Sequence, residues 1–244
     1  MGLTIYYSGK TKDLDKIRKI VEYVTFTAKN LGWEVIPVEE EGYVRDVIIR
    51  DEKGNVVSTS KYFVDKQTYE RMKYAGGRPS KRIGVIVNPP YKVESFNVSF
   101  FKDKDEWIWE DSTKTQVWTE KDLANLVAHQ IIANMLTTIK KTWLPDLEII
   151  DEGDYYVPLC KEERIKYAEK RKLPPEYREK FINMEPFNFE RLIENQLRYS
   201  RIIGALASAL AEALPPGFGI ETQTFKLEKE KKNNDTLDTE KQRR

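Results

Sequence analysis

Acidic side chains gather where a buried strand is expected to end. The stretch DLEIIDEGDYY, residues 146–156, places Asp151, Glu152 and Asp154 directly after an apolar run. One interpretation is a solvated surface turn, which the glycine within the cluster would permit. The other is a metal site in which Asp151 and Glu152 are joined by Glu94. Its ligands would all be oxygen atoms, so the cation would be Mg²⁺, Mn²⁺ or Ca²⁺, with Mg²⁺ or Mn²⁺ as the predicted cofactor.

Three further residues fit phosphoester chemistry around such a cation. Lys114 and Gln116 are two positions apart in an expected strand, so their side chains leave the same face. A cation would activate water, and Lys114 would neutralise charge developing on the phosphate. His129, the only histidine, is either a hydrogen-bonded core residue or a catalytic base, and its mixed neighbours favour the core. The single cysteine, Cys160, excludes a cysteine-based zinc site and an internal disulfide.

A basic segment precedes these residues. Between positions 61 and 92 there are eight lysines and arginines against two acids, with four tyrosines and a phenylalanine interleaved. Positive charge with aromatic rings suits phosphate neutralisation and base stacking. The alternative is a solvated loop in a lysine-rich protein. The residues predicted to bind nucleic acid are Arg71, Lys73, Arg78, Lys81 and Arg82.

The bulk composition sets the class of protein. The chain has 244 residues, a net charge of +1 and 33% charged residues, so any nucleic-acid partner must meet a local patch. Abundant Lys and Glu are typical of thermophilic proteins, and a lone cysteine fits a reducing cytoplasmic setting. The N-terminus lacks the pattern of a signal peptide. The apolar stretch 202–214 is too short to cross a membrane and contains Glu212.

Hydrophobic periodicity predicts the elements that position these residues. An apolar stripe predicts a helix that opens at Asp13 and ends near Gly32, and another helix is expected over 120–142 with Thr119 as its N-cap. DEKGN predicts a hairpin turn between 43–50 and 56–60. EDST predicts a turn between two short strands. The remaining strands are expected at 3–8, 33–38, 83–87, 96–100, 107–109, 114–118 and 147–150.

Together the elements predict an α+β fold with a mixed, mostly antiparallel sheet, two main helices and a helical C-terminal extension. The core domain is expected over 1–157, with a basic insertion at 61–82, and the extension over 158–225. Residues 226–244 are polar and are predicted to be disordered. A helix over 189–214 carries an apolar stripe that suits a partner helix, which predicts a homodimer.

Two resemblances bear on this arrangement. The segments NPPYKVESF, TKTQ, the helix around His129 and DEGDYY resemble those of a large prokaryotic family of uncharacterised proteins, over roughly residues 1–157 without the insertion. This resemblance implies no reaction. The order of helix, antiparallel strands, helix and strand is similar to the restriction-endonuclease-like nucleases. This chain has Glu94 where those carry Asp, and Lys114-Thr115-Gln116 in place of acid-x-lysine, so Glu110 or Asp111 would have to supply the missing acid.

Two functions from different classes follow. The first is a metal-dependent nuclease or related phosphoesterase that acts on nucleic acid. The alternative is a non-catalytic module that binds nucleic acid or protein and dimerises through its C-terminal helix. A shared pocket for Glu94, Lys114 and Asp151 would favour the first, and their separation would favour the second.

Overall fold

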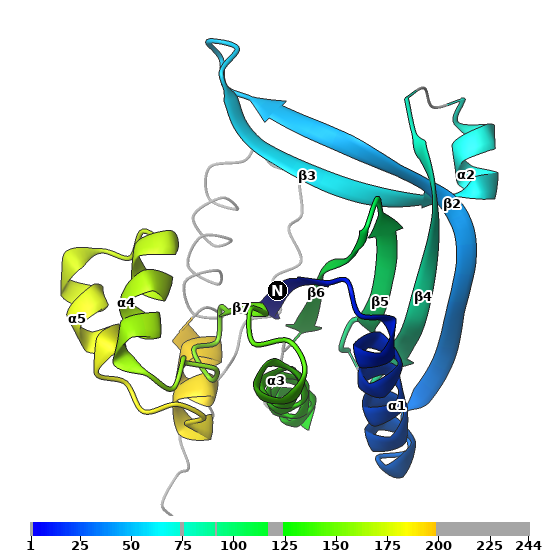
Figure 1. Cartoon of the computed structure of the whole chain (residues 1–244). Coiled ribbons are helices and arrows are strands. Elements are labelled where there is room, and N and C mark those ends of the chain that lie inside the picture. Colours follow the sequence, from blue (N-terminus) through cyan, green and yellow to red (C-terminus); the bar gives the residue numbers. More distant parts are fainter. Residues whose placement is uncertain (1, 74–75, 91, 117–123, 199–244) are drawn as a thin grey trace, which may run out of the picture.

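A single antiparallel sheet forms the centre of the computed structural model (Figure 1), which describes residues 2–73, 76–90, 92–116 and 124–198. Its seven strands are ordered β3-β2-β4-β5-β6-β1-β7, and every neighbouring pair is antiparallel. The predicted α+β class is therefore confirmed. The strands are β1 (Gly2–Thr11), β2 (Glu34–Arg50), β3 (Val56–Asp65), β4 (Arg78–Asn88), β5 (Phe96–Asp103), β6 (Glu106–Gln116) and β7 (Glu148–Asp151).

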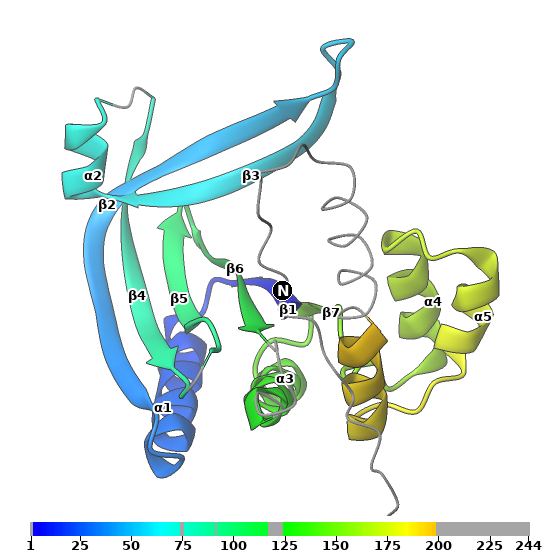
Figure 2. The same ribbon diagram turned by 180° about the vertical axis from the view of Figure 1, so that it is seen from behind.

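Two helices, α1 (Leu14–Asn30) and α3 (Ala124–Thr142), cover one face of the sheet (Figures 1 and 2). The Asp13 side chain caps α1 by accepting from the backbone N–H groups of Asp15 and Lys16, a cap that contributes about 1 kcal/mol. Gly32 follows the helix with φ +71°, a conformation that glycine adopts without strain. Both helices bury apolar side chains in one core with the strands. Thr119, the expected cap of α3, lies outside the described residues.

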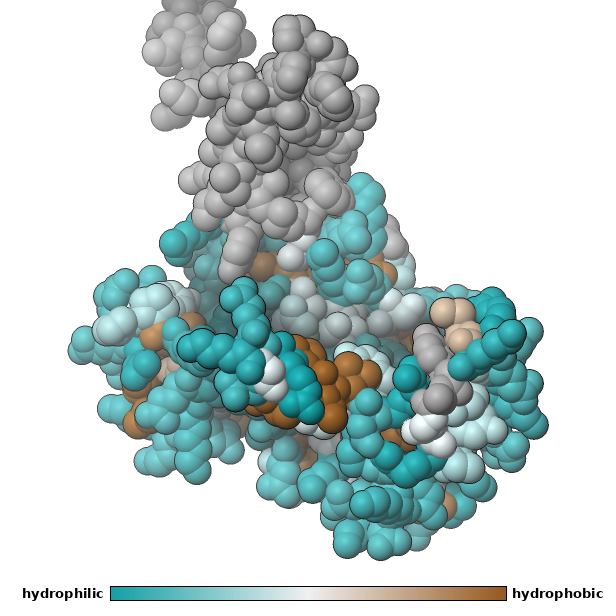
Figure 3. Space-filling model, turned by 90° about the horizontal axis from the view of Figure 1, so that it is seen from above, coloured by the Kyte–Doolittle hydropathy of each residue, from teal (hydrophilic) through white to brown (hydrophobic). Residues whose placement is uncertain are grey.

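The β2–β3 hairpin is longer than the sequence predicts and bends away from the rest of the sheet (Figure 1). The turn at DEKGN is confirmed, because Asp51 accepts from the N–H groups of Lys53 and Asn55, and Gly54 has φ +82°. Beyond the last β2–β4 pair, Val44–Arg78, the hairpin continues as two strands. Figure 3 looks down on it and shows apolar surface there. The exposed apolar residues of the hairpin are Val47, Ile48, Ile49, Val56, Val57 and Tyr62.

Strand β6 corrects the expected turn at EDST. Residues 110–113 continue one strand from Glu106 to Gln116, which pairs with β1 along its length. Glu110 and Ser112 lie on the side of the strand that faces away from the helices, whereas the polar groups of Asp111 and Thr113 are hydrogen-bonded to Asn97 and Tyr7. The 61–82 segment is also more regular than expected, since it completes β3, forms α2 (Lys66–Arg71) and begins β4.

The C-terminal extension begins as three helical pieces: α4 (Lys161–Lys170), α5 (Pro175–Ile182) and residues 189–198. The first two share a small core around Phe181, whereas Leu192 of the third piece is buried in the main core. The start of the apolar stripe is therefore covered by the chain itself. Residues 199–244, which include the rest of the stripe and the expected disordered tail, lie outside the described residues, so the homodimer stays a prediction. Among the described helices, none has the length and apolarity needed to cross a membrane.

Candidate functional site

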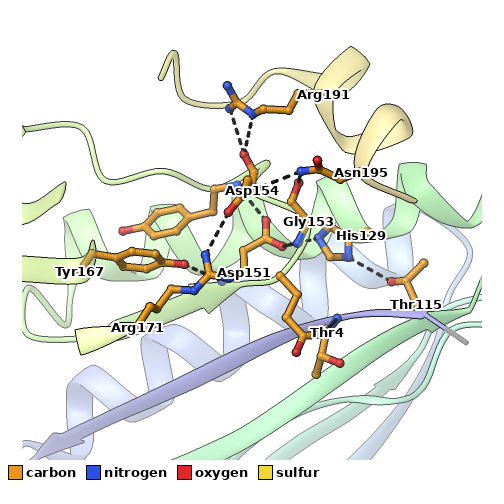
Figure 4. A network of polar contacts seen from close by, with 12 residues as sticks. Thr4, Thr115, His129, Asp151, Gly153, Asp154, Tyr167, Arg171, Arg191 and Asn195 are labelled. Carbon is orange, nitrogen blue, oxygen red and sulfur yellow. Dashed lines mark hydrogen bonds and ion pairs between the residues drawn. The ribbon is translucent and has the colours of Figure 1, made fainter. Parts of the chain in front are cut away.

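The acidic turn encloses a buried polar network (Figure 4). His129 on α3 and Asp151 at the end of β7 are both 0% exposed. His129 Nε2 lies 3.0 Å from Asp151 Oδ1, and its Nδ1 lies 3.2 Å from Thr115 Oγ1 on β6. The imidazole therefore has both ring nitrogens engaged inside the core, as the core-histidine alternative predicts.

Asp151 is held by backbone donors as well as by His129. Its Oδ1 accepts from the Gly153 N–H at 2.7 Å, and its Oδ2 accepts from the Tyr156 N–H at 2.8 Å. Burial alone would raise the pKa of Asp151, but the His129 charge and these hydrogen bonds outweigh it and lower the pKa. The solvated-turn interpretation is therefore wrong for Asp151, which is an ionised, fully bonded group in the core.

Asp154 ties the same turn to the C-terminal helices. It adopts φ +54° and is almost completely buried. Its carboxylate accepts from Arg171, which directly follows α4, at 3.0 Å, and from the Tyr177 hydroxyl on α5. Its backbone carbonyl accepts from Arg191 at 2.9 and 3.1 Å. The like charges at the end of β7 are thus balanced by protein cations and donors, and the turn anchors the extension to the sheet.

The three acids expected to hold a metal do not converge in this network. Glu94 is exposed beside β6, where its N–H donates to the Lys114 carbonyl. Glu152 accepts from the Thr4 N–H at 3.0 Å through its Oε2. Within the described ranges, no group of three or more His, Cys, Asp or Glu side chains is placed to hold a metal ion. The Mg²⁺ or Mn²⁺ site therefore stays a prediction that this arrangement does not support.

Lys114 and Gln116 also lie apart from the buried network. They alternate on β6 with the buried Thr113 and Thr115, so their side chains leave the opposite face from His129. Their strand neighbour is β1, where Lys114 pairs with Thr4. The acid whose pKa is affected by Glu94 is Asp111, not a member of the DEGD turn.

The basic segment is divided between the two faces of the sheet. Arg78 makes a two-pronged contact with Asp46, at 2.6 and 3.1 Å, and a third with Asp103 at 3.1 Å. Arg82 bonds Glu40 at 2.6 Å. Arg71 and Lys73 are exposed at the end of α2 and after it. Of the five residues predicted to bind nucleic acid, the two β4 arginines are therefore committed to carboxylates of the protein.

Lys81 lies between these arginines in sequence, but its side chain points to a different surface of the protein. It contributes to a hollow of about 510 Å³, here called the lysine hollow. Glu41 on β2 is the strand partner of Lys81 on β4. Lys102 is the next residue on β5 after Phe101, whose strand partner is Arg82. Among the described residues, none of the hollow's lysines forms an ion pair with a carboxylate. The hollow is lined by Glu41, Gly42, Tyr43, Lys66, Pro79, Ser80, Lys81, Lys102 and Lys104.

Of the four lysines of this hollow, only Lys81 is among the residues predicted to bind nucleic acid; Lys66 was counted only as part of the basic segment, and two others lie outside it. Lys102 and Lys104 belong to FKDKDE, where basic and acidic residues alternate and cancel in a local charge count. In the structure Asp103 turns inward, 3% exposed in its side chain, and bonds Lys61 and Arg78. The two lysines stay exposed on the other side. Period-two alternation at the end of a strand was the signal that would have separated them.

A second hollow lies on the face that α1 and α3 leave open. It measures about 650 Å³ and is here called the aromatic cleft. Tyr6, Tyr62, Phe63 and Phe101 contribute rings to its walls, and Asp111 lies within it. Burial raises the pKa of Asp111 above the usual Asp range, although hydrogen bonds and Arg82 oppose the shift. A carboxyl with a perturbed pKa in a cleft marks a candidate binding site.

Comparisons of the chain with protein-family models, curated proteins and solved structures found no match. The functional conclusion therefore depends on the geometry of the two hollows and of the buried network.

Proposed function

We propose that this protein binds nucleic acid through the lysine hollow and acts as a non-catalytic module. The observation that supports the proposal is the gathering of four exposed lysines around one hollow that holds a single acid, Glu41. They come from α2, β4, β5 and the turn after β5, so the fold gathers them from four separate segments of the chain. Within the described part of the chain these ammonium groups form no ion pair with a carboxylate, although Lys102 Nζ lies 5.9 Å from the Trp107 ring centre, and such groups can neutralise backbone phosphates and release their counterions.

The recognition proposed here concerns the phosphate backbone. Lysine presents a point charge on a flexible stem, which suits phosphates of any sequence. Tyr43 borders the hollow and is stacked on Tyr69, with ring centroids 3.9 Å apart, which gives one wall a flat apolar edge. The proposal therefore predicts affinity for nucleic acid with little sequence preference. The lone Cys160 fits a cytoplasmic site of action, where thiols stay reduced.

The test is fluorescence anisotropy with labelled single- and double-stranded oligonucleotides over a range of salt. If about four phosphates are neutralised, log Kd should change with log salt at a slope of magnitude near 3 to 4. Lys81→Ala combined with Lys102→Ala should reduce that slope by about 2. Lys16→Ala with Lys19→Ala on α1 is the matched control, because it removes the same charge from another surface. Equal losses in both double variants would refute the proposed surface.

The nuclease interpretation needs its own test, because the acids expected to hold the metal do not converge on one site. If Asp151, Glu152 and Glu94 hold a cation, millimolar Mg²⁺ or Mn²⁺ should raise the melting temperature by mass action. The same ions should then support cleavage of the labelled oligonucleotides. A melting curve indifferent to divalent cations, together with intact oligonucleotides, would remove cleavage and leave the binding proposal untouched.

A further inference from the structure

The aromatic cleft carries charges that the proposed function does not use. Three cations line it, and each is already bonded to a carboxylate: Lys61 to Asp103, Arg82 to Glu40 and Lys170 to Glu148. The cleft also holds Glu110 and Asp111, and the described part of the structure shows no ion pair for either. The charge left over in this cleft is therefore negative, the reverse of the lysine hollow.

Asp111 owes its position to a break in the sheet. Strands β5 and β6 pair only from Phe101–Ile108 to Asp103–Glu106 and then separate. Side chains bridge the opening: the Trp109 Nε1–H donates to the Asn97 carbonyl at 2.9 Å, and the Asn97 amide donates to Asp111 Oδ2 at 2.6 Å. The Ser112 N–H donates to Asp111 Oδ1 at 2.7 Å. Neutral donors thus hold the carboxylate in place without cancelling its charge.

Aromatic rings complete the walls around these acids. Tyr6 is 46% exposed and Tyr62 is 54% exposed, and both line the cleft, so each keeps surface that a ligand in the cleft can contact. The face of an aromatic ring attracts an ammonium or guanidinium group, and the attraction increases when the pair is partly desolvated. Phe63 already shows this contact inside the protein, since the guanidinium of Arg82 lies 5.0 Å from its ring centre. An acid within a hollow of aromatic rings is the arrangement that recognises organic cations.

We propose that the aromatic cleft binds a small organic cation carrying amine groups, with Asp111 and Glu110 as its counter-charges and Tyr6 and Tyr62 as its ring contacts. A cleft of about 650 Å³ is the size of small-molecule sites and has room for a diamine or a short polyamine. Phosphate and other anions are disfavoured by the two acids. This site lies on the opposite face from the lysine hollow and does not depend on nucleic-acid binding.

Proton linkage gives the site a second signature. The free carboxyl of Asp111 has a raised pKa because it is partly buried and close to Glu94. A bound cation favours the ionised form and therefore lowers that pKa. Binding should release protons when the pH is near the free value, and affinity should fall on acidification at a higher pH than an ordinary aspartate would require.

The experiment is isothermal titration calorimetry of the full chain at low salt with diaminobutane. Butanediol serves as a neutral ligand of the same carbon chain. We expect saturable one-to-one binding of the diamine and none of the diol. Asp111→Asn should weaken the diamine at least about tenfold, because a charged hydrogen bond is lost. Tyr62→Leu should weaken it severalfold through loss of the ring contact.

The control is Asp146→Asn, which removes the same charge from an exposed loop. Its diamine affinity should match the wild type. The Tyr62 variant changes a half-exposed side chain and preserves the test if Asp111→Asn fails to fold, which circular dichroism would reveal. Absence of saturable heat, equal binding of the diol, or unchanged affinity in folded Asp111→Asn and Tyr62→Leu would overturn the proposal.

Discussion

The lysine hollow and the aromatic cleft share strands β4 and β5 and carry opposite charge. Strand β4 sends Lys81 to the hollow and Arg82 to the cleft, and β5 sends Lys102 to the hollow and Phe101 to the cleft. Alternation along a strand is the cause. The comparison teaches that a basic run in a sequence does not define a basic surface. The surface charge depends on the face of the sheet to which each basic side chain points. It also depends on whether a carboxylate of the protein on that face already forms an ion pair with it.

The largest expected effect concerns the buried network of His129 and Asp151, which lines neither hollow. Asp151→Asn removes the charge that His129 faces in the core, and breaking a buried pair costs about 3 kcal/mol or more of unfolding free energy. Asp146→Asn, exposed in the preceding loop, should change it by less than about 0.5 kcal/mol. Urea denaturation measures both. Equal stabilities would show that Asp151 is dispensable and would contradict the geometry of the network.

A charge reversal separates the two hollows most directly. Lys81→Glu combined with Lys102→Glu should weaken oligonucleotide binding about a hundredfold at low salt, because attraction to phosphate becomes repulsion. The same variant should bind diaminobutane with unchanged affinity. Lys16→Glu with Lys19→Glu on α1 matches the change in net charge. If the α1 variant weakens oligonucleotide binding as much, the effect belongs to net charge and the comparison fails.

Arg78 sharpens the contrast between sequence and surface. Arg78→Ala leaves Asp103, which is almost completely buried, with Lys61 as its remaining cation, and it also releases Asp46. We expect a loss of about 1 to 2 kcal/mol of unfolding free energy, reduced by the partial exposure of the arginine. Oligonucleotide affinity should change less than about twofold. Lys81→Ala should show the reverse: weaker binding at unchanged stability. Chemical denaturation and anisotropy on the same samples would decide.

Local sequence patterns predicted the elements that depend on local interactions. The α1 stripe, its Asp13 cap and the DEKGN turn are short-range features, and the structure confirms them. The EDST turn was predicted wrongly because its polar residues are accommodated within a strand: Glu110 and Ser112 lie on its open face, whereas Asp111 and Thr113 are hydrogen-bonded to Asn97 and Tyr7. The pairing of His129 with Asp151 joins α3 to β7, and no periodicity encodes which strand end meets which helix. The lone histidine on an apolar helix was the only clue.

The candidate sites were less predictable than the elements, because they depend on contacts between segments that are distant in the sequence. Lys81 was singled out, yet Lys102 and Lys104 were hidden by neighbouring acids. Asp111 was considered as a substitute metal ligand, whereas the structure places it in an aromatic hollow between separated strands. Side-chain hydrogen bonds link β5 and β6 where the two strands separate. A reading of each strand by itself gives no sign of them.

The smallest expected effect compares two aspartates whose pKa values shift in opposite directions. The folded pKa of Asp151 is lowered, so its contribution to stability is present above the unfolded pKa of about 3.9 and is lost as the pH falls through the folded value. The folded pKa of Asp111 is raised, so the folded state binds its proton more tightly and stability decreases as the pH rises through that value.

Asp111→Asn should therefore leave stability at neutral pH unchanged or raise it by less than about 1 kcal/mol. Its effect should diminish as the medium is acidified, because the wild-type carboxyl then becomes neutral as well. Thermal melting of Asp111→Asn and Asp151→Asn from neutral pH to below about pH 4 measures the difference. A clear loss of stability in Asp111→Asn at neutral pH would mean that the Asp111 carboxylate stabilises the folded protein. That outcome would contradict its role as a counter-charge for a ligand.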